Sequence, residues 1–278
     1  MRMQYLGTAA YEGTPAVFCT CAICTAARKA GGRNIRTRAQ ALVNERILLD
    51  FGPDTYAHAL RYGLDLAQLR TCLITHTHSD HFYPEDLLAR MDGYCTLQAE
   101  YPLAIYGSAE TGEQLHRLLG TEKDRLGRLQ FHEVHAFEPF EAEDCRITPL
   151  PAVHGTKQPL VYLIQELQQG GKALLYAHDT YIFGDETWQW LADNAPHLDL
   201  VSLDCTMGLQ GGAADCHMSI ANDCVVRDRL LQMGLADEHT HFIANHFSHN
   251  GGLTYDRATD PEVNRGLEIS YDGMIVDF

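Results

Sequence analysis

The sequence predicts an α/β sandwich, and three observations lead to this prediction. Short apolar segments rich in β-forming residues alternate along the chain with segments of helical periodicity. Several neighbouring strands are separated only by turns of the length that hairpins use. Histidine and aspartate residues recur directly after predicted strands. Because 278 residues can bury one large core, we expect residues 1–278 to form a single domain.

The first half of the chain is predicted to begin, within residues 3–10, with a strand followed by a glycine-containing loop at 7–10. A hairpin follows, in which Asn44 and Glu45 separate strands at 39–43 and 46–49. The other elements predicted in this half are a helix at 55–69 weakened near its end by Gly63, strands at 71–74, 103–107 and 131–135, helices beginning after Pro84 and at 111, and a polar loop at 120–128.

The second half is also predicted to alternate between strands and helices. Gly170 and Gly171 favour a hairpin between strands at 160–164 and 173–176. Ser219 has the chemistry of an N-cap for a helix at 220–231. The remaining predicted elements are strands at 146–153, 198–203 and 241–245, a helix from residue 186, and a closing hairpin at 266–276 around Asp272 and Gly273.

Residues 75–81 place three imidazoles and a carboxylate between a predicted strand and a predicted helix. His76 and His78 are two residues apart, so on an extended backbone they share a face. Asp80 and His81 follow where the chain turns, so they can reach a second ion beside the first. Neutral imidazole and carboxylate both suit zinc and similar ions. The cluster therefore predicts a metal site rather than a solvated polar loop.

The spacing H-x-H-x-D-H resembles the signature of the metallo-β-lactamase superfamily. The resemblance implies a four-layer αββα sandwich, with two mixed sheets face to face, helices outside and the metal cleft along one edge. It also implies ligands after later strands, and His154, Asp179 and His246 stand at those positions. Asp50 matches an early aspartate that orients a ligand without touching metal.

Two divalent ions would share the seven ligands that this resemblance implies. The first would take His76, His78 and His154, the second would take Asp80, His81 and His246, and Asp179 and a water would bridge both. These ligands suit zinc, manganese and iron alike. The bridging hydroxide would attack phosphorus. Asp80 and His217 complete the expected catalytic set: relatives place a non-ligand histidine near residue 217, so His217 would be the general acid, unless it is an ordinary histidine of a capping loop.

A second cluster, formed by Cys19, Cys21 and Cys24, has a spacing that can close on one tetrahedral ion if a fourth ligand is supplied. On spacing alone, three free thiols near a surface loop remain an alternative. Together with His249, the cysteines resemble an arm of the cyclic phosphodiesterase of the carbon–phosphorus lyase pathway, and a related arm occurs in a pyrroloquinoline-quinone biosynthesis branch. The resemblance implies that these four residues hold a structural zinc, which pins an N-terminal arm at about residues 15–38 against the loop bearing His246.

Charge and composition limit the expected partners. The formal net charge of −16 argues against a nucleic-acid partner, whereas a small phosphate ester is compatible with it because two bound cations would invert the local field. No apolar run approaches the ~18 residues of a membrane span, so we expect no membrane partner. Nine cysteines without a secretory signal indicate reduced thiols and a cytoplasmic protein. The oligomeric state, a homodimer included, stays open.

The function expected from these patterns is hydrolysis of small, cyclic phosphodiesters. Two alternatives stay open: a lactonase or other carboxyl-ester hydrolase, since the same hydroxide attacks carbonyls, and a non-catalytic carrier of the quinone-biosynthesis type. Processing of transfer-RNA ends is disfavoured by the acidic chain.

One group of basic residues is noticeable in this acidic chain, and its interpretation stays open. It is either a solvated helix end and loop or a rim that contacts phosphate. This basic cluster consists of Arg28, Lys29, Arg33, Arg36 and Arg38.

Overall fold

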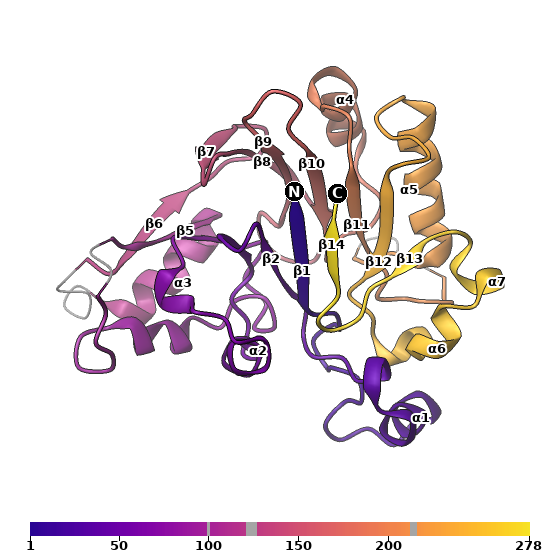
Figure 1. Ribbon diagram of the computed structural model, residues 1–278, viewed down its shortest axis with the longest axis horizontal. Helices are drawn as coiled ribbons and strands as arrows, with labels where there is room; N and C mark the ends of the chain where they lie inside the picture. The colour runs from indigo at the N-terminus through magenta and orange to yellow at the C-terminus, as the bar shows by residue number, and fades with distance from the viewer. Residues whose placement is uncertain (99–100, 121–126, 212–215) are drawn as a thin grey trace.

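The computed structural model in Figure 1 describes residues 1–98, 101–120, 127–211 and 216–278. Within these ranges the strands form two mixed sheets, ordered β14-β1-β2-β3-β4-β5-β6 and β13-β12-β11-β10-β9-β8-β7. Helices lie on the outer side of each sheet, so the predicted α/β sandwich is confirmed (Figure 1). The polar loop predicted at 120–128 falls mostly outside the described residues.

The first sheet combines strands from the first half of the chain with the last strand. Its strands are β1 (Arg2–Gly7), β2 (Gln40–Val43), β3 (Ile47–Leu49), β4 (Thr71–Leu73), β5 (Leu103–Gly107), β6 (Leu129–Glu133) and β14 (Ile275–Asp277). The pairings from β14 to β3 are antiparallel, and those from β3 to β6 are parallel. Asn44 and Glu45 lie in the three-residue loop of the β2–β3 hairpin and have positive φ angles of 49° and 58°.

The second sheet repeats this succession. Its strands are β7 (Phe140–Ala142), β8 (Cys145–Pro151), β9 (Leu160–Glu166), β10 (Ala173–Ala177), β11 (Leu200–Asp204), β12 (His241–Asn245) and β13 (Glu268–Ile269). The pairings from β7 to β10 are antiparallel, and those from β10 to β13 are parallel. Because parallel neighbours need crossover connections, helices separate β10, β11 and β12 along the chain.

The helices follow the amphipathic segments of the sequence. The α-helices are α1 (Ala22–Ala30), α2 (Thr55–Tyr62), α3 (Ala109–Leu119), α4 (Asp185–Asn194), α5 (Ile220–Gln232), α6 (Tyr255–Ala258) and α7 (Pro261–Asn264), and the 3₁₀-helices are η1 (Gly32–Asn34), η2 (Leu66–Gln68), η3 (Pro84–Arg90) and η4 (His249–Gly251). Ser219 caps α5 as predicted, since its hydroxyl accepts from the backbone N–H of Asn222. In Figure 1, α2 and α3 lie beside the first sheet, and α4 and α5 lie beside the second sheet.

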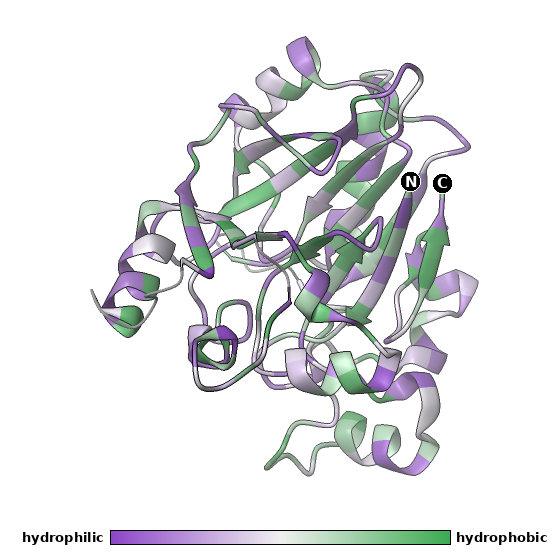
Figure 2. Cartoon of the chain, turned by 60° about the vertical axis from the view of Figure 1, so that its left-hand side comes forward, coloured by the Kyte–Doolittle hydropathy of each residue, from purple (hydrophilic) through white to green (hydrophobic). Residues whose placement is uncertain are grey.

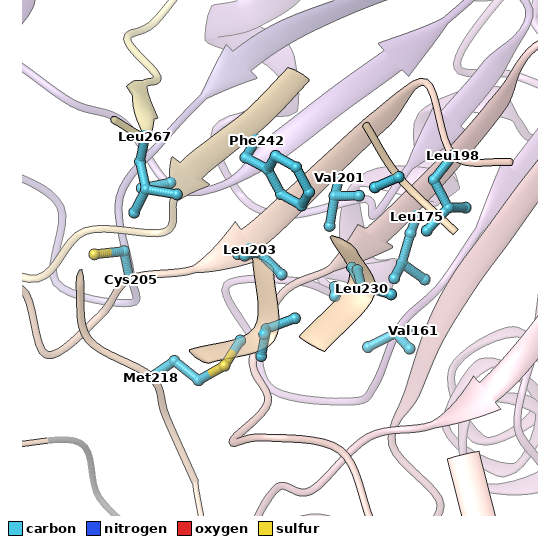
Figure 3. Packing of buried hydrophobic residues seen from close by; sticks show 14 of the residues in the cluster. Val161, Leu175, Leu198, Val201, Leu203, Cys205, Met218, Leu230, Phe242 and Leu267 are labelled. Atoms are coloured by element: carbon cyan, nitrogen blue, oxygen red, sulfur yellow. The ribbon is translucent and has the colours of Figure 1, made fainter. Parts of the chain in front are cut away.

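Three apolar clusters fill the spaces between the layers. The central cluster joins both sheets, and the outer two join each sheet to its helices. Alternation along β10 shows the division, because Leu174 and Tyr176 enter the central cluster whereas Leu175 faces the helices. Figure 3 shows part of that outer cluster, where Leu230 of α5 packs with Val201 of β11. In Figure 2 hydrophobic residues predominate along the strands, whereas the helices carry both kinds.

Three predicted elements differ from the structure. The helix expected at 55–69 ends at Tyr62, because Gly63 adopts a left-handed conformation and stops it. The helix expected after Pro84 is the 3₁₀-helix η3. The prediction of a closing hairpin at 266–276 is wrong, because the two strands in this segment, β13 and β14, belong to different sheets. Asp272 lies between them, and the chain uses this turn to cross from one sheet to the other.

Among the described residues, no helix combines the length and the apolar character needed to cross a bilayer.

Candidate metal centre

The site lies where the carboxyl ends of several strands meet. Loops after β3, β4, β8, β10, β11 and β12 supply its residues, as is usual for the open edge of an α/β sheet. Three of these residues turn the chain sharply in the left-handed region, with φ of 68° at Asp50, 49° at Asp179 and 60° at His246. Such backbone strain costs about 1–3 kcal/mol per residue and is typically retained at functional sites.

The loop after β4 is held in place by the loop after β3. The N–H of Phe51 donates to the carbonyl of His81 at 2.8 Å, and the N–H of Tyr83 donates to the carbonyl of Phe51 at 2.7 Å. A Cβ at Gly52 would overlap the carbonyl oxygen of Asp80, so only glycine permits this close approach. The two loops therefore fix the backbone that carries the H-x-H-x-D-H motif.

The first donor group gathers three imidazoles around Asp179. Nδ1 of His78 lies 3.0 Å from Nε2 of His76 and 3.1 Å from Nε2 of His154. Oδ2 of Asp179 lies 3.2 Å from Nε2 of His76. One ligand atom from each of the four residues lies within 4.8 Å of all the others. Ring nitrogens that converge in this way can be satisfied together by a cation at their centre.

The second donor group lies beside the first and is buried throughout. Nε2 of His81 lies 3.1 Å from Nε2 of His246 and 3.3 Å from Oδ2 of Asp80. The same Oδ2 of Asp179 that faces the first group lies 3.1 Å from Nε2 of His81. A single carboxylate oxygen thus adjoins both groups.

Asp179 is the strongest sign that the residues fit metal ions. Its side chain is buried, and its Oδ1 makes no hydrogen bond within the described residues, although Nδ1 of His246 lies 3.1 Å away and Nδ1 of His217 lies 3.4 Å away. A buried carboxylate oxygen left in this state costs free energy that a bound cation would recover. With imidazole and carboxylate donors only, the two groups could hold zinc, manganese or iron.

The charges within the site support the same conclusion. Burial and the neighbouring His81 lower the pKa of His76 to about 4, so its ring is neutral near pH 7 and can act as a ligand. Burial lowers the pKa of His81, but Asp80, Asp50 and Asp179 raise it well above its usual value. The carboxylates therefore exceed the cationic charge within reach, which leaves a site suited to a metal cation.

Asp50 takes the position expected from the sequence, behind a ligand. Its Oδ2 lies 2.7 Å from Nδ1 of His81, and its Oδ1 accepts from the N–H of Thr75 at 2.8 Å. With its Nδ1–H donating to Asp50, His81 directs Nε2 at the second group, where a bound cation would take the place of the proton on Nε2.

His217 lies on the open side of both groups and is paired with a residue that the sequence analysis missed. Nδ1 of His217 lies 3.1 Å from Oδ2 of Asp204, which is fully buried at the end of β11. Oδ1 of Asp204 also accepts from the N–H of Thr206 at 2.8 Å. The signal was present, because Asp204 ends a buried strand just as Asp179 follows one.

The electrostatics of His217 are dominated by carboxylates. Burial lowers its pKa, but the hydrogen bond and charge of Asp204, with the charges of Asp179 and Asp80, raise the pKa to about 9. Its Nδ1 is also 3.4 Å from Oδ1 of Asp179, so distances alone would allow His217 to join a cation there. His217 and His154 both line the cavity above the donor groups, which has a volume of about 330 Å³.

The cysteine cluster, defined as Cys19, Cys21, Cys24 and His249, also comes together. Nδ1 of His249 lies 3.5 Å from Sγ of Cys21 and 3.7 Å from Sγ of Cys19, and all four ligand atoms lie within 4.8 Å of one another. Backbone N–H groups point at the sulfurs, such as that of Cys24 at Sγ of Cys21, 3.4 Å away. That hydrogen bond, opposed by burial and aided by His249, lowers the pKa of Cys21 to about 6. A thiolate at neutral pH suits zinc.

The basic cluster is used within the arm. Arg36 is buried and donates to the hydroxyl of Thr8 and the carbonyl of Ser270, each at 2.8 Å. Arg28 donates to the carbonyl of Cys19 at 2.7 Å, and Arg38 pairs with Asp54 at 3.1 Å. The contacts of Arg36 and Arg38 tie the arm to the sandwich and that of Arg28 lies within the arm, so these three side chains give no support to the phosphate-contacting rim considered from the sequence.

Comparison with known proteins gives a consistent result. The sequence model of the Beta-lactamase superfamily domain matches residues 45–231. An octanoyltransferase of Porphyromonas gingivalis is 30% identical over 183 residues, covering 60% of this chain and 34% of that protein. A ribonuclease Z of Synechococcus is 34% identical over 132 residues, covering 44% of this chain and 41% of that protein. The chain thus spans about a third to a half of the length of the curated relatives it matches.

Solved structures resemble the whole chain. A diphosphatase of the PhnP family has a TM-score of 0.73 and 21% identity, covering 100% of this chain and 97% of the other. Zinc-bound PqqB of Methylobacterium extorquens has a TM-score of 0.69 and 18% identity, covering 100% of both chains. At such identities the likeness shows the fold alone.

Proposed function

Since this chain belongs to the metallo-β-lactamase superfamily of hydrolases, we propose that it is a metal-dependent phosphodiesterase that cleaves small, cyclic or linear, phosphodiesters. One observation carries the proposal. Two donor groups share Oδ2 of Asp179, and His217 stands above them in hydrogen-bond contact with the buried Asp204. This arrangement offers places for two cations and, on the open side, a proton donor.

Two divalent ions would be held by residues from four segments of the chain. The first would take His76, His78 and His154, the second would take Asp80, His81 and His246, and Asp179 would serve both. When bound, such a pair of ions makes water a nucleophile at neutral pH and neutralises the oxygens of a phosphodiester. The protein's own part is to fix the ligands, and Asp50 does so for His81.

His217 would transfer a proton to the leaving oxygen. The carboxylate of Asp204 holds Nδ1–H of the ring, so the proton available to substrate is the one on Nε2. Cations bound at Asp179 and Asp80 would offset two of the charges that raise the pKa of His217, whereas Asp204 remains beside the ring. An alkoxide is a poor leaving group, so protonation by this group should contribute about 10²–10⁴-fold.

The size of the cavity and the charge of the chain favour a small substrate. The cavity of about 330 Å³ is at the lower end of the range for small-molecule sites. The net charge of −16 opposes a polyanionic nucleic acid. A diphosphatase and a ribonuclease Z are among the similar proteins, and both names denote action on phosphate linkages.

We also propose that the cysteine cluster holds a structural zinc. Three thiols and one imidazole fill a tetrahedral shell, which leaves no position for substrate. Arg28, which donates to the carbonyls of Cys19 and Ala16, would keep the arm closed over the ion.

A substrate panel tests the proposed activity. The protein loaded with zinc, manganese or iron should hydrolyse bis(p-nitrophenyl) phosphate and cyclic nucleotides, and chelation should abolish turnover. Faster turnover of lactones than of phosphodiesters would favour the carboxyl-ester hydrolase instead. Metal loading with no turnover of any of these compounds would favour the non-catalytic carrier.

His217→Ala tests the proton donor. We expect kcat to fall about 10²–10⁴-fold with the metal content unchanged. Asp204→Asn, which removes the charge but keeps the shape, should give a smaller loss, since the ring keeps its place but not its preferred tautomer. Metal content should be measured for both. If His217→Ala lost as much metal as His76→Ala, His217 would be a ligand and not the acid.

A further inference from the structure

The turn that carries Tyr11 and Glu12 forms one wall of the cavity. The N–H of Gly13 donates to the carbonyl of Ala10 at 3.0 Å, so Tyr11 and Glu12 are the two central residues of a β-turn. Ala10, Tyr11 and Glu12 line the cavity together with the proposed ligands and His217. None of the patterns used in the sequence analysis pointed to this turn.

This turn is anchored on both sides. The N–H of Ala10 donates to the carbonyl of Phe247 at 3.1 Å, and that of Thr14 donates to the carbonyl of Arg36 at 2.9 Å. Nε of Arg38 donates to the carbonyl of Tyr11 at 2.8 Å. A backbone fixed in this way presents its central side chains in a defined position, which is what a specificity wall requires.

Tyr11 offers a flat aromatic surface at the mouth of the cavity. This residue is 60% exposed and lines the cavity, so its ring is accessible to a ligand. A ring held at this position can stack on a nucleobase, and such stacking contributes about 1–3 kcal/mol.

Glu12 places a carboxylate at the same wall. Oε1 accepts from Nδ2 of Asn250 at 3.1 Å and lies 4.0 Å from Nε2 of His249, so Glu12 also adjoins the cysteine cluster. Within the described part of the chain, Oε2 has only a long contact of 3.5 Å with Oγ of Ser248. Since a carboxylate has about four acceptor positions, Oε2 can still accept from a ligand hydroxyl. Its charge would repel a second anionic group and favour a neutral, hydroxylated one.

We propose, on the basis of the phosphodiesterase function above, that the substrate is a phosphodiester of a nucleoside, with its base stacked on Tyr11 and a sugar hydroxyl donating to Glu12. The phosphate would lie over the two donor groups and the nucleoside would extend toward the arm. The cysteine cluster then has a second role, because it holds beside the active site the residues that select the substrate.

Three substrates with the same leaving group test this assignment. They are the p-nitrophenyl esters of methyl phosphate, of ribose 5-phosphate and of uridine 5′-phosphate, which add first the sugar and then the base. Tyr11→Ala should raise KM for the uridine ester alone, by about tenfold. Glu12→Gln should raise KM for the ribose and uridine esters by about tenfold and leave the methyl ester unchanged. In both variants kcat should stay within about twofold of wild type.

Matched substitutions control for general effects of the changes. Tyr56→Ala removes a ring that is 70% exposed on α2, and Glu238→Gln changes a carboxylate that is 84% exposed. Both variants should leave KM for all three esters unchanged. Zinc content should be equal in every variant. A uniform loss over the three esters would show that the turn is only structural and would overturn the assignment, as would equal KM values of the wild type for the methyl and uridine esters. No metal-dependent turnover of any ester would instead refute the phosphodiesterase function itself.

Discussion

The strand-end centre, made of the two donor groups around Asp179, and the cysteine cluster are both sets of metal-ligating side chains, but they are assembled in opposite ways. The strand-end centre draws its residues from loops after four strands, from His76 to His246, and opens into a cavity. The cysteine cluster takes three of its four ligands from six consecutive residues and has a complete tetrahedral set.

This difference separates chemistry from anchorage. Open coordination and mixed imidazole and carboxylate ligands leave room for substrate and water. Closed thiolate coordination adds folding free energy to an arm that has little core of its own. In Figure 1 the arm with α1 lies below the sheets, and no residue of the arm is a member of the three apolar clusters. If this division is right, a substitution in one site should leave the other site intact. A change in the strand-end centre should lower activity, and a change in the cysteine cluster should lower stability.

Asp179→Ala should have the largest effect and should affect activity. The variant removes the one oxygen that adjoins both donor groups, so we expect kcat/KM to fall by more than about 10³-fold. Metal analysis should show the strand-end ions lost or weakened and one zinc retained. Asp144→Ala, at a side chain that is 91% exposed, is the control. Loss of the retained zinc as well would contradict independent sites.

Cys21→Ser should have the next largest effect and should affect stability. Removal of one thiolate should release about one zinc per chain and lower the free energy of unfolding by about 3 kcal/mol or more. Hydrolysis of the methyl ester should persist, because none of the strand-end ligands is touched. Cys224→Ser, on α5 and outside the cluster, is the control. A variant that lost every metal ion without any structural change would show that there is no separate structural site.

The residues predicted from the sequence came together because their signals are local. The H-x-H-x-D-H and C-x-C-x-x-C motifs each span six consecutive residues, and His154, Asp179 and His246 each follow an apolar strand that is recognisable by itself. The resemblance to a known family then supplied their order along the chain. The structure places His154, Asp179 and His246 beside His76 and His81, which is the arrangement that the proposed metal centre requires.

The features that the sequence did not reveal depend on long-range contacts. The role of Asp204 is visible only when His217 lies beside it, although the two are thirteen residues apart with a turn between them. Asp272-Gly273 has the local appearance of a hairpin turn, but the carboxylate accepts from Thr8 and Thr37 and so guides the chain to the other sheet. Turn chemistry specifies a bend and not the sheet that receives the next strand.

A buried hydrogen-bond network joins α2 to Asp50, behind the strand-end centre. The smallest effect that we predict concerns the contribution of this network to the stability of the fold. His58 of α2 has Nδ1 at 2.6 Å from Oε1 of Gln40, and Nε2 of Gln40 donates to the carbonyl of Asp50 at 2.9 Å. Burial lowers the pKa of His58 to about 4, so the ring is neutral in the folded protein.

His58 should therefore make the stability depend on pH. In the unfolded chain its pKa is about 6.5, so between about pH 6.5 and 4 the unfolded state binds a proton that the folded state does not. The stabilisation is complete above pH 6.5 and is lost as the pH falls toward 4, by about 1.4 kcal/mol per pH unit.

His58→Gln removes this contribution to the pH dependence. The free energy of unfolding in urea should therefore differ less between pH 7 and pH 5 in the variant than in the wild type. His239→Gln, at a side chain that is 84% exposed, should behave as wild type. An equal loss of stability in His58→Gln and wild type between these pH values would mean that the acid sensitivity arises elsewhere, for example in the metal ligands themselves.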